Sequence, residues 1–115
     1  MTIYNVKVAI FDLVFTVGDT INILMTFTDD DDPAFTLVGK QLDIDVVDNS
    51  GNIIRSFTSA GGSPTIIIVD NTARLYSLTP FSFVAKYKFD LQYMAGSEVN
   101  TIGKGNVIIQ KQYTT

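Results

Sequence analysis

The fold is decided by the stretch Lys86–Gln110, which reads KYKFDLQYMAGSEVNTIGKGNVIIQ. It begins with alternating polar and apolar side chains, and this period of two is typical of a β-strand with one buried and one solvent-exposed face. Gly96 follows this run and can adopt a positive φ angle, so it provides a turn. The remainder returns as the partner strand, in which Gly103 and Gly105 predict a β-bulge or a bend. We expect the apolar side chains of the first strand to be buried: Tyr87, Phe89, Leu91 and Tyr93.

The rest of the chain repeats this pattern of short alternating segments separated by turns. Thr20–Thr28 is a predicted strand that ends at the run Asp29–Pro33, because four like charges followed by proline cannot pair inside a sheet. Residues 42–46 form another strand, which places Asp43 and Asp45 on its outward face. Further strands are predicted at residues 52–58, 65–69 and 73–78. Alternation outscores the helical period throughout, so the sequence predicts a single all-β domain, an antiparallel β-sandwich of about eight strands.

The first 17 residues carry apolar side chains on both faces of the chain. Their apolar positions shift phase at Ile10 and Phe11, and a shift of one residue moves the apolar set to the other face of a strand. Either a bulge lies near these two residues or the strand crosses between two sheets. We therefore divide the chain into residues 1–17, a strand or interface arm, and residues 18–115, the sandwich. One core can cover only one face, so we expect another chain to cover the other. The predicted interface residues are Tyr4, Val6, Val8, Phe11, Leu13 and Phe15.

The composition narrows the range of partners. The formal net charge is −4 and the sequence pI about 4.4, so no basic patch is available for nucleic acid or for an anionic membrane surface. Hydrophobic residues make up 46% of the chain and the mean hydropathy is +0.24, which is high for so small a domain. The surplus indicates either a dense sandwich core or a surface that a partner covers.

The residue types present leave few catalytic devices. The chain contains no His and no Cys, which excludes Ser-His-Asp and Cys-His catalysis and thiolate metal sites. A hydrolase that uses two carboxylates is one rival interpretation, with Asp43 and Asp45 as the nearest pair. The run Asp29–Asp32 could bind Ca²⁺, but it lacks the spaced ligands of a calcium loop, and we expect a solvated turn. We therefore expect no catalytic residue, no metal ion and no cofactor.

A second rival is a carbohydrate-binding adhesion module on a virion or cell surface. Such sites use aromatic platforms, and this chain has eight Phe and five Tyr but no Trp. Tyr4, Tyr76 and Tyr113 are candidates for such a platform, with core or interface packing as the alternative. An exposed coplanar pair of Tyr rings would favour this interpretation, and the absence of such a pair would count against it.

Several short motifs follow one another between Gly18 and Gln112. They are Gly18-Asp19-Thr20 before a strand, the Asp-rich turn with Pro33, Leu37-Val38-Gly39, the turn from Val46 to Gly51, Gly61-Gly62 before an Ile-rich strand, the strand from Tyr87 to Tyr93, Gly96-Ser97, Thr101-Ile102 and Lys104-Gly105. In this order and spacing they resemble the immunoglobulin-like domain found at the N-terminus of phage baseplate upper proteins and of related phage tail and fibre proteins.

This resemblance implies an immunoglobulin-like β-sandwich and a non-enzymatic structural role in the virion, with the protein made in the host cytoplasm. The expected partners are other virion proteins and copies of the chain itself, and neither nucleic acid nor a membrane. The role would be that of a tail or baseplate component, a fibre-attachment component or a capsid decoration. Because the chain ends at Thr115, shortly after the last strand, we expect a small free-standing component.

Overall fold

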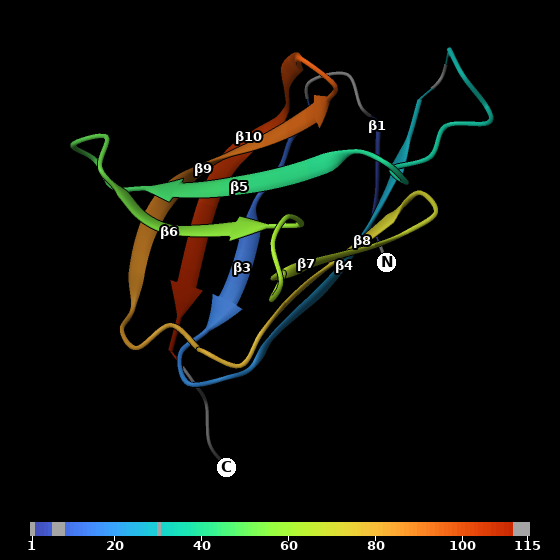
Figure 1. Ribbon diagram of the computed structural model, residues 1–115. Coiled ribbons are helices and arrows are strands. Elements are labelled where there is room, and N and C mark those ends of the chain that lie inside the picture. Colours follow the sequence, from blue (N-terminus) through green and yellow to red (C-terminus); the bar gives the residue numbers. More distant parts are fainter. Residues whose placement is uncertain (1, 6–8, 30, 112–115) are drawn as a thin grey trace.

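The computed structural model describes residues 2–5, 9–29 and 31–111, and for residues 2–5 and 9 the backbone alone. These residues form strands and no helix, and the strands make two facing sheets (Figure 1), so the predicted immunoglobulin-like β-sandwich is confirmed. The strands are β1 (Thr2–Asn5), β2 (Ala9–Ile10), β3 (Leu13–Thr16), β4 (Ile21–Thr28), β5 (Gln41–Val47), β6 (Ile53–Thr58), β7 (Ile66–Val69), β8 (Thr72–Ser77), β9 (Ala85–Ala95) and β10 (Glu98–Gln110).

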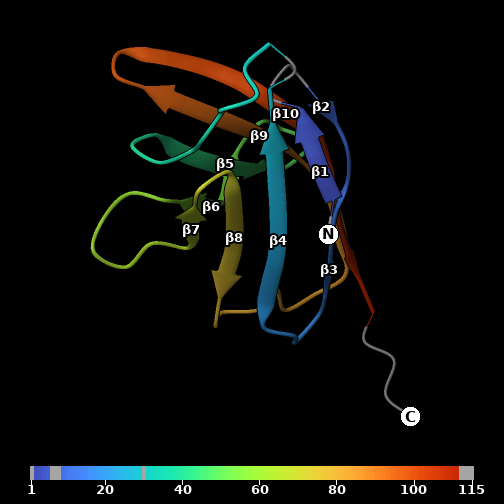
Figure 2. The same ribbon diagram turned by 90° about the vertical axis from the view of Figure 1, so that its right-hand side faces the viewer.

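Sheet A has the strand order β1-β4-β8-β7. Sheet B has the order β2-β10-β9-β5-β6, and β3 also pairs with β10 (Figure 2). The pairs among β4 to β10 are antiparallel, as predicted. The N-terminal strands differ from the prediction, because β1 is parallel to β4, and β2 and β3 are parallel to β10.

The N-terminal segment changes sheets. The change occurs between β1, which lies in sheet A, and β2, which lies in sheet B, and so before the phase shift at Ile10 and Phe11. At the phase shift itself the chain stays in sheet B, which agrees with the bulge alternative and not with a crossing at that point. An irregular link at Phe11 and Asp12 separates β2 from β3, at the place where the phase shifts. It stays fixed to sheet B because the amide of Phe11 donates a hydrogen bond to the carbonyl of Lys104, 3.1 Å away. The amide of Asn106 in turn donates to the carboxylate of Asp12.

The β9–β10 hairpin has the predicted turn and bulge. Gly96 lies in the turn with a φ angle of +62°, a conformation that other residues adopt only with strain. The pairing register shifts between Thr101 and Gly103, which is the predicted bulge. Of the four side chains expected to be buried, Phe89 and Leu91 are buried, whereas Tyr87 and Tyr93 are half-buried and pack against the edge of the core. The alternation thus predicted the direction of each side chain, but not that the sandwich opens at its ends.

Gly105 has a role that the sequence did not indicate. It is paired in register with Phe89, so it does not interrupt the sheet. Instead, the backbone of Phe11 crosses directly over it. A methyl group at this position would overlap the carbonyl oxygen of Phe11 and lie 2.7 Å from its carbonyl carbon. Glycine is therefore required here for close approach of the N-terminal link to β10.

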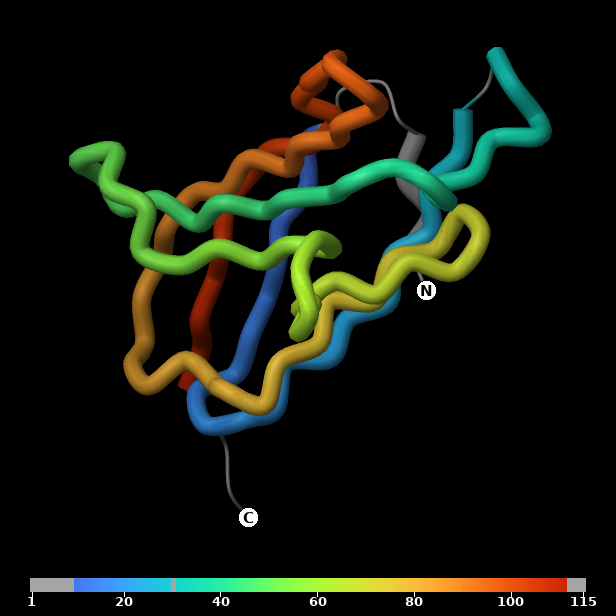
Figure 3. The backbone as a smooth tube through the Cα atoms, viewed as in Figure 1, coloured from blue at the N-terminus to red at the C-terminus, as the bar shows by residue number. Residues whose placement is uncertain are grey.

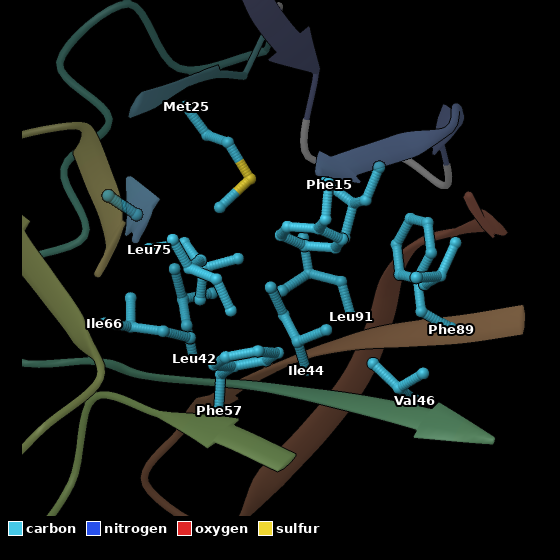
Figure 4. Packing of buried hydrophobic residues seen from close by; sticks show 14 of the residues in the cluster. Phe15, Met25, Leu42, Ile44, Val46, Phe57, Ile66, Leu75, Phe89 and Leu91 are labelled. Atoms are coloured by element: carbon cyan, nitrogen blue, oxygen red, sulfur yellow. The ribbon is translucent and has the colours of Figure 1, made fainter. Parts of the chain in front are cut away.

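The core fills the space between the two sheets (Figure 4). Met25 and Leu75 of sheet A face Leu42, Ile44 and other residues of sheet B, and all four side chains are fully buried. The irregular segment before β9 closes one end of the core through the tilted contact of the Phe81 ring with the Phe15 ring, whose centroids lie 5.0 Å apart. The guanidinium of Arg55 lies over the Phe81 ring, and burial lowers its pKa from the ordinary value.

Candidate functional site

A cleft of about 610 Å³ opens at the end of the sandwich away from Phe81, a volume within the usual range for ligand sites. Its walls are the loop that follows β4 and the part of the β9–β10 hairpin near its turn, which lie at the same end of the molecule (Figure 3). We call it the end cleft. Its lining residues are Asp29, Asp32, Ala34, Phe35, Thr36, Lys40, Tyr93, Asn100, Thr101 and Ile102.

The Asp-rich run builds one wall as a tight turn. Asp29 accepts hydrogen bonds through its side chain from the amide of Asp31 and through its carbonyl from the amide of Asp32. The side chain of Asp32 accepts from the amide of Ala34, and its carbonyl accepts from the amide of Phe35. Each carboxylate thus replaces a backbone partner in the turn, as short acidic side chains commonly do. The consequence is that Phe35 is placed at the mouth of the sandwich.

Two aromatic rings meet inside the end cleft. Tyr93 lies on the inner face of β9, in register with the buried Leu42, so its side chain points into the space between the sheets. Its ring lies nearly parallel to that of Phe35, at an interplanar angle of 28° with the centroids 6.2 Å apart. Lys40 fixes the pair from one side, because its ammonium group donates to the carbonyl of Thr36 at 2.6 Å and lies 5.4 Å and 6.0 Å from the two ring centroids.

The surroundings of Tyr93 in the end cleft raise the pKa of its phenol. Partial burial raises the pKa of its phenol above the ordinary value, and the nearby carboxylates of Asp29 and Glu98 raise it further. The phenol is therefore protonated at neutral pH and can donate a hydrogen bond.

The predicted absence of metal stays a prediction. Across residues 9–29 and 31–111, no group of three or more Asp, Glu, His or Cys side chains is placed to hold a metal ion. The two Asp side chains in the end cleft, Asp29 and Asp32, accept hydrogen bonds from backbone amides of the turn described above.

The carboxylate pair singled out for a hydrolase lies elsewhere. Asp43 and Asp45 project from the outer face of β5, as predicted, and neither lines the end cleft. Asp43 accepts hydrogen bonds from Gln41 and Thr58, and Asp45 accepts one from Ser56 at 2.7 Å. The contacts with Thr58 and Ser56 connect β5 to its neighbour β6.

The residues predicted to form an interface fall into three groups. Leu13 and Phe15 are buried in the core of this chain, so they stabilise the sandwich and present no surface to a second chain. Phe11 is half-buried and packs against Phe89, with ring centroids 5.1 Å apart. Val6, Val8 and the side chain of Tyr4 lie outside the described residues. Leu13–Thr16 is a strand of sheet B, and the role of residues 1–17 as an interface arm stays a prediction.

Two exposed apolar side chains of β2 and β3 were not predicted from the sequence. Ile10 is 78% exposed and Val14 is 46% exposed, and both point to the outer face of sheet B, opposite Lys104 and Ile108 of β10. Alternation along β3 predicts the direction of one of them, because Val14 must point away from the face that Leu13 and Phe15 share. What the sequence could not provide was which of the two faces meets the core.

A second apolar edge lies on sheet A. The strand β7 pairs with β8 on one side, and its Ile67 and Val69 are 45% and 60% exposed. A shallow cleft of about 320 Å³ runs beside it and includes Val38. The predicted surplus of apolar residues thus appears partly as exposed strand edges.

The tyrosines proposed as a sugar platform do not form a pair in the described structure. Tyr76 is exposed on the outer face of sheet A, between Asn22 and residue 65. Tyr113 and the side chain of Tyr4 lie outside the described residues. The near-parallel pair that does occur is Phe35 with Tyr93, which alternation could not find because Phe35 follows a turn.

Comparison with known proteins yields a structural likeness. No family model matches the sequence, and no curated protein matches it. Among solved structures, the chain is similar to the N-terminal domain of phage TP901-1 ORF48, with a TM-score of 0.51 and 12% sequence identity. The alignment covers 96% of this chain and 100% of that one. At this identity the likeness concerns the fold. The described residues contain no helix that is long and apolar enough to span a membrane.

Proposed function

We propose that this chain is a non-enzymatic structural component of a phage virion, which docks onto other virion proteins and onto copies of itself. The observation that carries the proposal is the likeness to the N-terminal domain of a phage protein over nearly the whole length of both chains. Two features support it. The chain lacks the His and Cys that most catalytic devices need, and its net charge of −4 disfavours nucleic acid as a partner.

The docking surface that we propose is the outer edge of β2 and β3. On their other side, both strands pair with β10. Ile10 and Val14 lie along this edge with exposed apolar side chains. An edge strand of this kind offers backbone hydrogen-bonding groups together with apolar contacts, which are the two requirements for the addition of a strand from a neighbouring protein. We expect the contact to bury on the order of 1,000 Å² or more in total, as specific interfaces do.

Within the particle, the chain would serve as a tail or baseplate component, a fibre-attachment component or a capsid decoration. It would be made in the host cytoplasm and then incorporated during assembly. These locations differ in the neighbours that they provide.

The test is incorporation into particles of a phage that encodes the chain. The double variant Ile10→Asp with Val14→Asp places two charges on the proposed edge, and Leu78→Asp is the matched control, because Leu78 is 75% exposed in the segment that follows β8. We expect all three proteins to fold by circular dichroism, the double variant to be absent from purified particles, and the control to be incorporated normally. Normal incorporation of the double variant would refute docking through this edge. Absence of the unaltered chain from purified particles would refute the proposed function itself.

A further inference from the structure

We propose that the end cleft binds a neutral saccharide. The proposal goes beyond a structural role and does not depend on it, because it is argued from the chemistry of the cleft alone.

The first argument is the pair of aromatic rings. Phe57 and Phe89 on the inner faces of the sandwich are buried, whereas Phe35 and Tyr93 are half-buried, as Tyr87 is, and line the cleft, which Tyr87 does not. Folding of the domain therefore leaves part of their surface uncovered. The uncovered part of each ring is apolar and can pack against the C–H groups of a sugar ring.

The second argument is that the pair is held in place before any ligand binds. Lys40 donates a hydrogen bond to Thr36 and lies over both rings, and the turn of the Asp-rich run fixes Phe35 through its own amide. Side chains that are already ordered lose little conformational entropy on binding. A small entropy loss matters for a saccharide, because each sugar unit makes few contacts.

The third argument is the polar rim, which matches hydroxyl groups. The carboxylates of Asp29 and Asp32 are acceptors, Asn100 and Thr101 both donate and accept, and the protonated phenol of Tyr93 donates. A sugar hydroxyl donates and accepts at the same oxygen, so it can use both kinds of group. The cleft thus combines an apolar platform with a few convergent polar groups, as ligand sites do.

The charges in the cleft select against acidic ligands. Asp29 and Asp32 face a single cation, Lys40, whose ammonium group already contacts a carbonyl oxygen and two rings. A phosphate, sulfate or uronic acid would be repelled by the two carboxylates. The saccharide expected is therefore an uncharged one.

The experiment uses the full chain and four free sugars, tested singly at millimolar concentration: glucose, galactose, rhamnose and N-acetylglucosamine. Saturation-transfer NMR reports contact with the protein, and amide shifts of the labelled protein report the place. We expect at least one sugar to receive saturation and to shift the amides of Phe35, Tyr93 and Asn100. Absence of both effects for all four sugars would overturn the proposal.

Three matched variants replace a ring by a branched aliphatic side chain: Phe35→Leu, Tyr93→Leu and Tyr76→Leu. We expect the first two to weaken binding about tenfold, a difference readily measured by titration, and the third to leave binding unchanged, because Tyr76 lies on the outer face of sheet A. Thermal melting checks that each variant is folded. Equal affinity in all three would overturn the proposal.

A dilution series without sugar distinguishes the saccharide from a protein occupant. If the cleft amides shift with protein concentration and not with sugar, the cleft holds part of a second copy, and the saccharide proposal is overturned. If they are independent of protein concentration and respond to sugar, the proposal is supported.

Discussion

Replacement of Gly105 by alanine tests how the N-terminal link is fixed to the sandwich. The added methyl group would overlap the carbonyl oxygen of Phe11 and lie 2.7 Å and 3.2 Å from its carbonyl carbon and amide nitrogen. All three atoms belong to the backbone, so no change of rotamer relieves the contact. The link between β2 and β3 must move away from β10.

The cost follows from what that movement breaks. The hydrogen bond from the Phe11 amide to the carbonyl of Lys104 is worth about 0.5–1.5 kcal/mol net. The contact between the rings of Phe11 and Phe89 is worth about 0.5–1.5 kcal/mol. We therefore expect Gly105→Ala to lower the free energy of unfolding by about 1–3 kcal/mol, which is also the usual range for overpacking.

Urea unfolding followed by circular dichroism measures this difference, and two other glycines calibrate it. A methyl group at Gly103 would lie 2.9 Å from the Phe11 ring, which can move, so we expect a smaller loss. At Gly62 nothing lies within 4 Å and the φ angle is ordinary, so Gly62→Ala should change stability by less than about 0.5 kcal/mol. In Gly105→Ala the amides of Leu13–Thr16 should also exchange faster with solvent. If Gly105→Ala is as stable as Gly62→Ala, the proposed close approach is wrong.

Three further predictions address the core, the turns and the metal question. Phe89→Ala should lower the free energy of unfolding by about 3–5 kcal/mol, as for a fully buried ring, and a loss as large for the exposed Lys88→Ala would mean that the register is wrong. The backbone amide of Asn52, with help from that of Ser50, lowers the pKa of Asp48. The hydrogen bonds stabilise the folded chain above the pKa that Asp48 has in the unfolded chain, and this stabilisation is lost as the pH falls through the pKa of Asp48 in the folded chain. Asp48→Asn should therefore flatten the loss of stability below about pH 4. An unchanged dependence of stability on acid pH, measured by urea unfolding, would contradict this. Millimolar Ca²⁺ should leave the melting midpoint unchanged, and a rise would show that the folded chain binds the ion, because a ligand of the folded state must stabilise it.

The sequence predicted most of the sandwich, because its strands carry their own local signal. The alternation in β4, β5 and β9 specifies which side chains face inward, and the turn at Gly96 has the positive φ angle predicted for it. The parallel pairing of the first three strands could not be predicted. For β2 and β3 it joins segments at opposite ends of the chain, and for β1 it skips over two strands to reach β4. No local pattern specifies partners that are not neighbours in sequence.

The candidate sites were predicted less well, for two physical reasons. Leu13 and Phe15 were assigned to an interface because alternation reports that a face is apolar, but not which layer covers it. The end cleft was missed because its two rings come from a turn and from the last inner position of β9. Their meeting depends on where the sandwich opens, which is a property of the whole fold.

The central claim, a docking role in the virion, is tested most directly by a cryo-electron microscopy map of particles from a phage that encodes the chain. We predict that the map contains density that fits the sandwich, repeated according to the symmetry of the particle. A neighbouring protein should cover the β2–β3 edge at Ile10 and Val14. A complete map of the particle with no density for this chain would contradict the account.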